Sequence, residues 1–173
     1  MLTNTSVNLL LDEREDGTMS FKKAADYVKA KGFEDRIQEF DVSSATVELA
    51  AKAVGTQPGR IAKSLTFRVE EQPIMILCAG DVKIDNSKYK KTFHAKAKML
   101  TPDEVITLIG HEVGGVCPFG IEDGVVVYLD ESLKKYDTVY PACGSKNSAV
   151  KLTVEELEAL SNAKEWVDVC KLV

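Results

Sequence analysis

The sequence predicts an α/β protein of the α+β type, with a mixed β-sheet and helices packed beside it. Short apolar runs typical of strands alternate along the chain with segments of helical periodicity. Two consecutive runs, 64–69 and 74–79, lie close enough to form a β-hairpin. Hairpins among helix-linked strands favour a mixed sheet over a doubly wound parallel sheet.

Length and composition indicate one globular domain. The chain has 173 residues, 45% of them hydrophobic and 28% charged, which is enough for a substantial core. Within this single domain, we expect residues 1–35 to form an N-terminal arm and helix packed on residues 36–173. No apolar run approaches the roughly 20 residues that a membrane helix needs, and residues 1–11 lack the basic start and cleavage site of a signal peptide.

Cysteine and histidine usage gives no metal signal. Two histidines lack ligand spacing, and the cysteines form no CxxC pair. The four cysteines are Cys78, Cys117, Cys143 and Cys170. We therefore expect reduced thiols, a cytoplasmic protein, and neither a metal nor a cofactor.

The first half of the chain predicts the following elements. Residues 1–17 are rich in acids and show little periodicity, so we expect an irregular arm there. Ser20 is expected to cap a helix that runs to Ala30, with Gly32 after its end. The next elements are a strand over 36–42, a helix over 46–54 with Gly55 at its end, a helical turn from Pro58, the hairpin, a helix over 86–93 and a strand over 97–100. The second hairpin strand is a continuous apolar run, so it should be buried on both faces.

The second half contains the clearest helix starts. Thr101–Glu104 and Thr153–Glu156 are capping boxes. The predicted elements are a helix from 101 to 110, a strand over 125–129, a helical turn over 131–135, strands over 138–142 and 149–152, a helix to 160 and a strand over 166–169.

A glycine-rich stretch over residues 113–121 is the first candidate functional feature. Gly114, Gly115, Pro118 and Gly120 break any regular element, yet the other residues of the stretch are mostly apolar. This composition suggests backbone that lies against another group, with amide N–H groups that could hold a carbonyl or an oxyanion. A buried connection between a helix and a strand is the alternative.

Lys63 is the second candidate, because it lies at the mouth of a strand between apolar residues. A partly desolvated lysine there could neutralise a phosphate or polarise a carbonyl. Alternatively, its stem follows apolar surface and its ammonium stays in water. The sequence has no GxSxG, P-loop or GxGxxG motif and no strong Ser/His/Asp set.

Charge is distributed unevenly. The net charge of −5 argues against binding of long nucleic acids. Six lysines and only two acids nevertheless fall within residues 81–98, enough to meet a few phosphates. These lysines are Lys83, Lys88, Lys90, Lys91, Lys96 and Lys98. A simple solvated face is the alternative.

Four motifs, in one order, resemble the YbaK/EbsC family of prolyl-tRNA-synthetase-associated editing domains. They are Gly55-x-x-Pro58-Gly-x-Ile-Ala-Lys63-Ser-Leu-x-Phe67, Gly80-Asp with Ile84-Asp85, the GxxxP loop Val113-Gly-Gly-Val-Cys-Pro-Phe-Gly120, and Tyr128-Leu-Asp-Glu-Ser-Leu133 with the turn around Gly144. The resemblance runs from about Phe40 to Val169, and residues 1–35 match less well.

The resemblance implies a fold and an activity. The family fold is a mixed, largely antiparallel, barrel-like sheet with flanking helices, and it needs no metal. The implied activity is a freestanding trans-editing deacylase that hydrolyses the ester of a mischarged aminoacyl-tRNA, with tRNA-Pro carrying Cys or Ala as the expected substrate. The expected partners are the acceptor end of the tRNA and prolyl-tRNA synthetase, without a membrane. The alternative is a non-catalytic module of the same fold that binds an acceptor stem or a synthetase.

The resemblance also implies site residues. Lys63, Gly114 and Gly115 would be catalytic, with water or a substrate hydroxyl or thiol as the attacking group. The implied substrate-binding residues are Phe40, Cys117, Pro118, Phe119, Ala142 and Gly144. The implied tRNA-binding residues are Lys88, Lys90 and Lys91.

Three departures from the family pattern bear on specificity more than on the reaction. Cys117 stands where serine is common, and His111 where an aromatic residue is common. Ala142 and Ala149 stand where cysteine-specific members carry a hydroxyl and an acid. A nucleophilic Cys117 is disfavoured because only His111 is near it in sequence, and a Schiff-base role for Lys63 lacks an evident acid–base partner.

Overall fold

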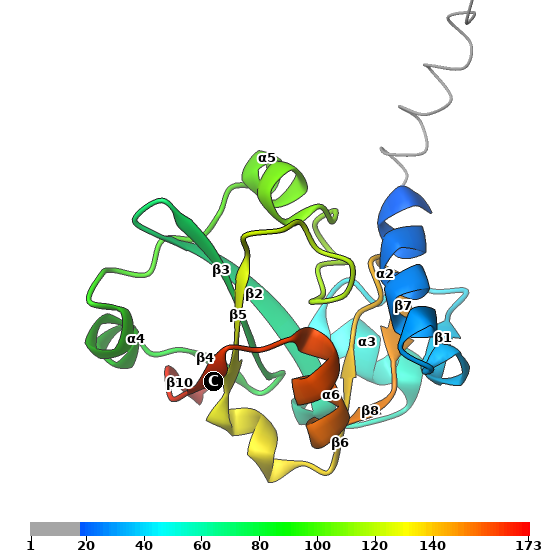
Figure 1. Ribbon diagram of the computed structural model, residues 1–173. Helices are drawn as coiled ribbons and strands as arrows, with labels where there is room; N and C mark the ends of the chain where they lie inside the picture. The colour runs from blue at the N-terminus through cyan, green and yellow to red at the C-terminus, as the bar shows by residue number, and fades with distance from the viewer. Residues whose placement is uncertain (1–17) are drawn as a thin grey trace, which may run out of the picture.

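The computed structural model describes residues 18–173, so the arm predicted over residues 1–17 lies outside it. Six strands form the main sheet in the order β8-β6-β2-β3-β5-β9 (Figure 1). The strands are β1 (Ile37–Glu39), β2 (Ile61–Val69), β3 (Gln72–Ala79), β4 (Val82–Ile84), β5 (Val126–Asp130), β6 (Thr138–Pro141), β7 (Ser148–Val150), β8 (Leu152–Thr153), β9 (Glu165–Val167) and β10 (Cys170–Leu172). The α-helices are α2 (Thr18–Ala30), α3 (Val47–Val54), α4 (Asn86–Phe93), α5 (Pro102–Glu104) and α6 (Val154–Ser161).

The sheet is mixed and curls into a half-barrel, as the family resemblance implied. The predicted hairpin is confirmed as the antiparallel pair β2–β3, and β6–β8 is also antiparallel. The pairs β2–β6, β3–β5 and β5–β9 are parallel. Two small antiparallel pairs, β1–β7 and β4–β10, extend the sheet system at its margins.

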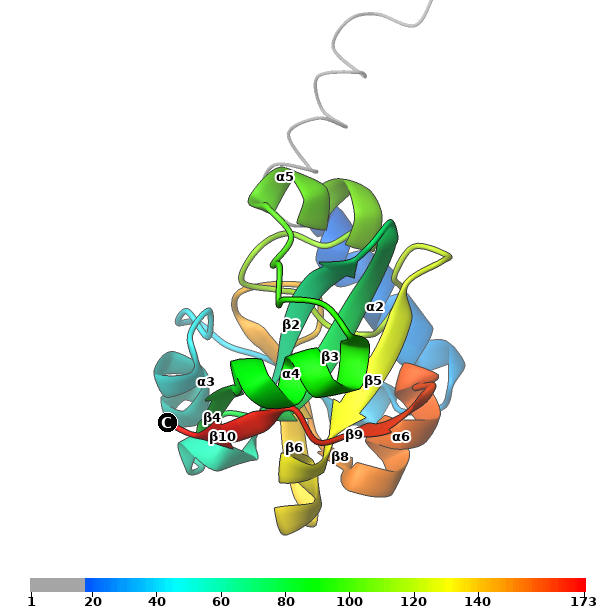
Figure 2. The same cartoon turned by 90° about the vertical axis from the view of Figure 1, so that its left-hand side faces the viewer.

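Helices cover both faces of the sheet. In Figure 2, α4 lies in front of β2, β3 and β5, whereas α2 and α6 lie behind them. Tyr89 of α4 packs its ring 5.3 Å from that of Phe67, and Phe93 packs 5.1 Å from Tyr128. Behind the sheet, the Tyr27 hydroxyl of α2 donates to the Leu160 carbonyl of α6 at 2.7 Å. The helices thus close one continuous core around the hairpin.

Local sequence signals set most helix ends. Both predicted capping boxes are present, at Thr101–Glu104 and Thr153–Glu156. Thr46 caps α3, which ends at Gly55 with φ of 82°. The prediction that Ser20 caps the first helix is wrong, because Ser20 lies inside α2 and its hydroxyl contacts His111.

Strand predictions failed where pairing is non-local. The strand expected over 36–42 is only β1, and the one expected over 97–100 is a single bridge between Met99 and Phe67. The pair β4–β10 was not predicted. Such short segments become strands only because a distant segment lies beside them. No helix within residues 18–173 is long and apolar enough to cross a membrane.

Candidate active site

A cavity opens where two strands of the main sheet part. β2 pairs with β6 only through Ile61 and Ala62, because β6 ends at Pro141 whereas β2 continues to Val69. A cavity of about 390 Å³ occupies the space beside the part of β2 that extends beyond its pairing with β6. Its walls come from β2, α3, the segment 99–105, the glycine-rich stretch and the segment 140–149.

Among the described residues that line this cavity, Lys63 supplies the only charged side chain. It lies on β2, is half-buried, and its ammonium donates a hydrogen bond to the carbonyl oxygen of Val82. That carbonyl belongs to β4, which is itself held by β10. A cation in an otherwise uncharged and mostly apolar wall interacts strongly with any negative charge that enters.

Gly114 lines the cavity, and its conformation requires glycine. Its φ is +96°, a value that side-chain-bearing residues rarely adopt. A Cβ there would lie 3.4 Å from Lys146 Cβ and 3.5 Å from Ala45 Cβ, which are ordinary contacts. Within residues 18–173, the N–H groups of Gly114 and Val116 donate to no acceptor. The stretch therefore brings free backbone donors to the cavity wall.

Gly115 has a different role from its neighbour. Its N–H donates to the Glu112 carbonyl at 3.1 Å. A Cβ on Gly115 would lie 2.5 Å from the carbonyl carbon of Gly144 and 2.6 Å from the Ser145 nitrogen. Gly115 thus allows the glycine-rich stretch to pack against the backbone of the 143–147 turn.

His111 anchors the glycine-rich stretch to α2. Its Nε2–H donates to the Phe119 carbonyl at 2.7 Å, and its Nδ1 lies 2.8 Å from the Ser20 hydroxyl. Because a carbonyl only accepts, Nε2 carries the proton and Nδ1 accepts from Ser20. Burial lowers the pKa of His111 from 6.5 to about 4, so the imidazole is neutral at physiological pH. The neutral ring thereby links Phe119, in the second half of the stretch, to Ser20 of α2.

Cys117 lies behind the cavity wall, fully buried. Its sulfur is 3.5 Å from His111 Nε2 and 3.7 Å from the Phe119 carbonyl. Burial raises the pKa of the Cys117 thiol, and the neighbouring nitrogen already donates its proton to Phe119. Neither observation favours a nucleophilic thiolate.

The other predicted substrate-binding residues lie at various depths. Ala142 lines the cavity, whereas Phe119 and Gly144 are buried behind it. Pro118 lines a second pocket of about 260 Å³ together with Tyr27 and Asn162. Phe40 is half-buried, and its N–H donates to the Asn147 carbonyl at 2.8 Å. Of the predicted residues, the cavity wall thus brings together Lys63, Gly114 and Ala142.

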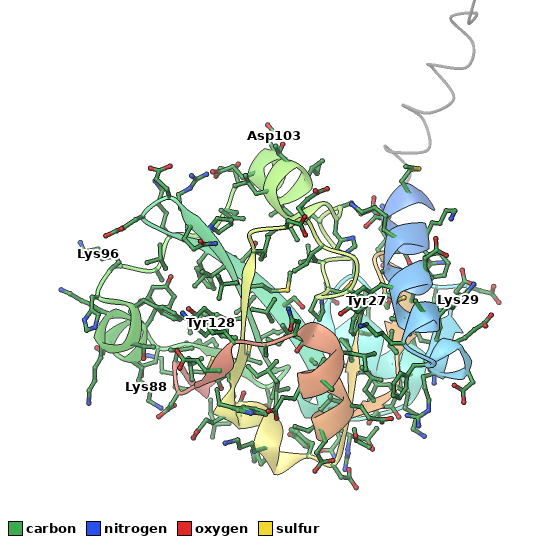
Figure 3. The ribbon with its side chains drawn as sticks, in the orientation of Figure 1. Tyr27, Lys29, Lys88, Lys96, Asp103 and Tyr128 are labelled. Carbon is green, nitrogen blue, oxygen red and sulfur yellow. The ribbon has the colours of Figure 1, made fainter. Side chains whose placement is uncertain are left out.

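The three lysines predicted to bind tRNA lie on α4. Lys90 and Lys91 are exposed. The Lys88 ammonium is already engaged, since it donates to Asp168 Oδ1 and to the Cys170 carbonyl, each at 3.0 Å. Figure 3 shows Lys88 and Lys96 at the side of the molecule that carries α4.

Sequence reasoning missed two unpaired hydroxyl groups of the cavity wall. The hydroxyl oxygens of Ser44 and Ser64 are buried and make no hydrogen bond within residues 18–173. Ser64 directly follows Lys63 and could have been singled out with it, whereas Ser44 gives no signal in the sequence. No group of three or more His, Cys, Asp or Glu side chains in the described part of the chain could hold a metal ion.

The chain belongs to the aminoacyl-tRNA editing domain family, whose model matches residues 41–160. This match confirms the resemblance to YbaK-like editing domains drawn from the four motifs. A relative from Bacillus subtilis (strain 168), the uncharacterized protein YwhH, is 53% identical over 154 residues, which are 88% of this chain and 98% of YwhH.

Proline–tRNA ligases are also related. The enzyme of Geobacillus sp. (strain WCH70) is 25% identical over 152 residues, which are 79% of this chain but only 26% of the ligase. A solved structure described as a proposed trans-editing enzyme for prolyl-tRNA synthetase has a TM-score of 0.80 and 32% identity, and covers 88% of this chain and 97% of its own. Another solved structure, of the hypothetical protein APE2540, has a TM-score of 0.76 and 25% identity. The match covers 86% of this chain and 99% of APE2540.

Proposed function

We propose that this protein is a freestanding trans-editing deacylase that hydrolyses the ester of a mischarged aminoacyl-tRNA in the cytoplasm. The supporting observation is the cavity beside β2, where the single cation Lys63 shares an uncharged wall with the free N–H of Gly114. The first substrates to consider are tRNA-Pro molecules that carry Cys or Ala. Prolyl-tRNA synthetase, which would release such products, is the proposed functional partner.

The chemistry needs no protein nucleophile. Water adds to the carbonyl carbon of the ester. The carbonyl oxygen of the ester then becomes negative in the tetrahedral intermediate. The Lys63 ammonium and the Gly114 N–H would stabilise that oxyanion, which is the charge that develops in the transition state. The bond from carbon to the terminal ribose oxygen then breaks, and the ribose oxygen takes a proton. Free amino acid and uncharged tRNA leave.

The small residues of the wall suit a small aminoacyl group. Ala45, Ala142 and Ala149 line the cavity, and its volume of about 390 Å³ lies at the low end for small-molecule sites. None of the lining residues within 18–173 is acidic, so a cationic side chain would lose its hydration without gaining a partner there. These features support a small, uncharged amino acid as the substrate.

A panel of mischarged tRNAs tests the proposal. The release of amino acid is followed over time for tRNA-Pro charged with Cys, Ala and Pro, with correctly matched Ala-tRNA and Cys-tRNA as controls. We expect hydrolysis of at least one mischarged tRNA-Pro, and its loss with Lys63→Ala. Tight binding of these tRNAs without release of any amino acid would instead identify a non-catalytic binding module.

A further inference from the structure

Two large apolar side chains lie exposed at the rim of the cavity. Met99 and Val113 both line it, yet they are 61% and 58% exposed. They come from different segments, Met99 from the chain beside β2 and Val113 from the glycine-rich stretch. Exposed apolar side chains that share the mouth of a cavity mark a surface that another molecule covers.

A cation lies at the same rim. Lys146 is exposed, and its Cβ is 3.4 Å from the position of a Cβ on Gly114. Its carbonyl accepts a hydrogen bond from the Ser44 N–H at 2.6 Å, and Gly114 and Ser44 both line the cavity. Within residues 18–173 the Lys146 ammonium has no salt bridge or hydrogen bond. By contrast, Lys88 is paired with Asp168 at 3.0 Å.

We propose that this rim, formed by Met99, Val113 and Lys146, binds the terminal nucleotide of the tRNA, with its base on the two apolar side chains and its 5′ phosphate on the lysine. The inference rests on the proposed function, because it assumes that the ester lies between Lys63 and Gly114. The ribose that carries the ester must then lie just outside the cavity, so its base and phosphate cross the rim. Apolar surface and an unpaired cation are the groups that bind a base and a phosphate in single-stranded nucleic acid.

Two minimal substrates isolate the phosphate contact. They are 3′-O-alanyl-adenosine and the same compound with a 5′ phosphate, or the corresponding cysteinyl pair if cysteine is the amino acid released from tRNA. Lys146→Ala should lower kcat/KM for the phosphorylated compound about fivefold, the size of one exposed charge pair, mainly through KM. For the compound without phosphate, Lys146→Ala should change kcat/KM by less than about twofold. Equal loss on both compounds, or loss on neither, would overturn the assignment of Lys146.

Matched variants test the apolar part of the rim. Met99→Ser and Val113→Ser should raise KM for both minimal substrates while kcat stays near that of the parent. Leu172→Ser is the control, because Leu172 is 67% exposed on β10 and does not line the cavity. Lys164→Ala is the matched lysine control, because Lys164 is exposed and does not line the cavity, and it should leave both minimal substrates unaffected. If Leu172→Ser raises KM as much as the rim variants do, the rim is not a base-binding surface.

A binding measurement with a non-hydrolysable probe distinguishes a failure of the rim assignment from a failure of the proposed function. The probe is 3′-deoxy-3′-alanylamido-adenosine 5′-phosphate, whose amide resists hydrolysis. If the parent hydrolyses no ester but binds this probe more tightly than Lys146→Ala does, deacylation is refuted and the rim assignment stands. If the two bind it equally, the rim assignment fails. Dimerisation of the parent that Met99→Ser abolishes, without weaker binding of the probe, would assign the rim to contacts between copies.

Discussion

Lys63 combines two properties at the cavity wall. Its ammonium is held by the Val82 carbonyl, yet it is the only charge among the lining residues in the described part of the chain. The carbonyl fixes the position of the ammonium without neutralising its charge. A cation positioned before the substrate arrives needs no reorganisation when the oxyanion forms.

Removing this ammonium should abolish most of the deacylation. Lys63→Met keeps an apolar stem on β2 and should lower kcat/KM at least about tenfold, or about 1.4 kcal/mol of transition-state stabilisation. Single-turnover release of amino acid from mischarged tRNA measures the effect, and a thermal melt controls for folding. A folded Lys63→Met protein with parental activity would exclude a catalytic role for Lys63.

His111 makes stability depend on pH. Its pKa is about 4 in the folded protein and about 6.5 when unfolded, so the unfolded state binds the proton first. The contribution of the neutral imidazole to the free energy of unfolding is complete above pH 6.5 and is lost as the pH falls from 6.5 to 4. The loss should reach about 3 kcal/mol at pH 4.5. Lys23 and Glu122 have opposite Coulomb effects on the ring, and burial dominates both.

Urea unfolding at pH 7.5 and 4.5 measures this dependence. His111→Phe removes the titrating group and fills the same space with the aromatic side chain common in the family. Its free energy of unfolding should change less between the two pH values than that of the parent. Carboxylates that also titrate are present in both proteins, so the difference isolates His111. Equal pH dependence in the two proteins would contradict the buried neutral imidazole.

At the level of elements, Gly114 and Gly115 differ in the room that each has for an added Cβ. Gly115→Ala would place a methyl group against the backbone of Gly144, which cannot move aside as a side chain can. We expect a loss of about 1–3 kcal/mol in stability, as for other overpacked sites, together with lost activity because the stretch shifts. A thermal melt and a deacylation assay measure both. A Gly115→Ala protein with parental melting temperature would show that the 143–147 turn adapts.

Cys117→Ser is the matched substitution in the same element. The serine hydroxyl can donate to the Phe119 carbonyl, the acceptor that the thiol faces at 3.7 Å. Most of the activity should therefore remain, and thiol alkylation of the native protein should be slow. Inactivation by Cys117→Ser, with folding retained, would revive the nucleophilic thiolate.

Elements with local signals could be predicted from the sequence, and those without could not. The capping boxes, Gly55 and the apolar hairpin run determine their own structure, so α3, α6, β2 and β3 were predicted correctly. The strands β4 and β10 are short and lie about half the chain apart in sequence. Lys63 and Gly114 were predicted to share a site, and both line the cavity. Whether Gly115 faced substrate or backbone depended on the distant turn at Gly144, which no pattern near Gly115 encodes.

For the molecule as a whole, the lysines of α4 offer a separate test of how tRNA is bound. Lys90 and Lys91 are exposed and have no salt bridge within residues 18–173. Reversing both to Glu should weaken tRNA binding and reduce its salt dependence, because fewer counterions are released. Titrations at several salt concentrations measure the slope. An unchanged slope would leave α4 as an ordinary solvated face, with the acceptor end bound elsewhere.

The bond between Lys63 and Val82 also has a consequence for biosynthesis. Lys63 is translated early, but its carbonyl partner lies on β4, which pairs with β10, the last of the described strands to be made. Pairing across such a distance in sequence forms late in folding. A nascent chain should therefore hold this ammonium less firmly before β10 has been made and paired with β4. The proposed deacylase activity should accordingly be weaker in a chain that lacks β10.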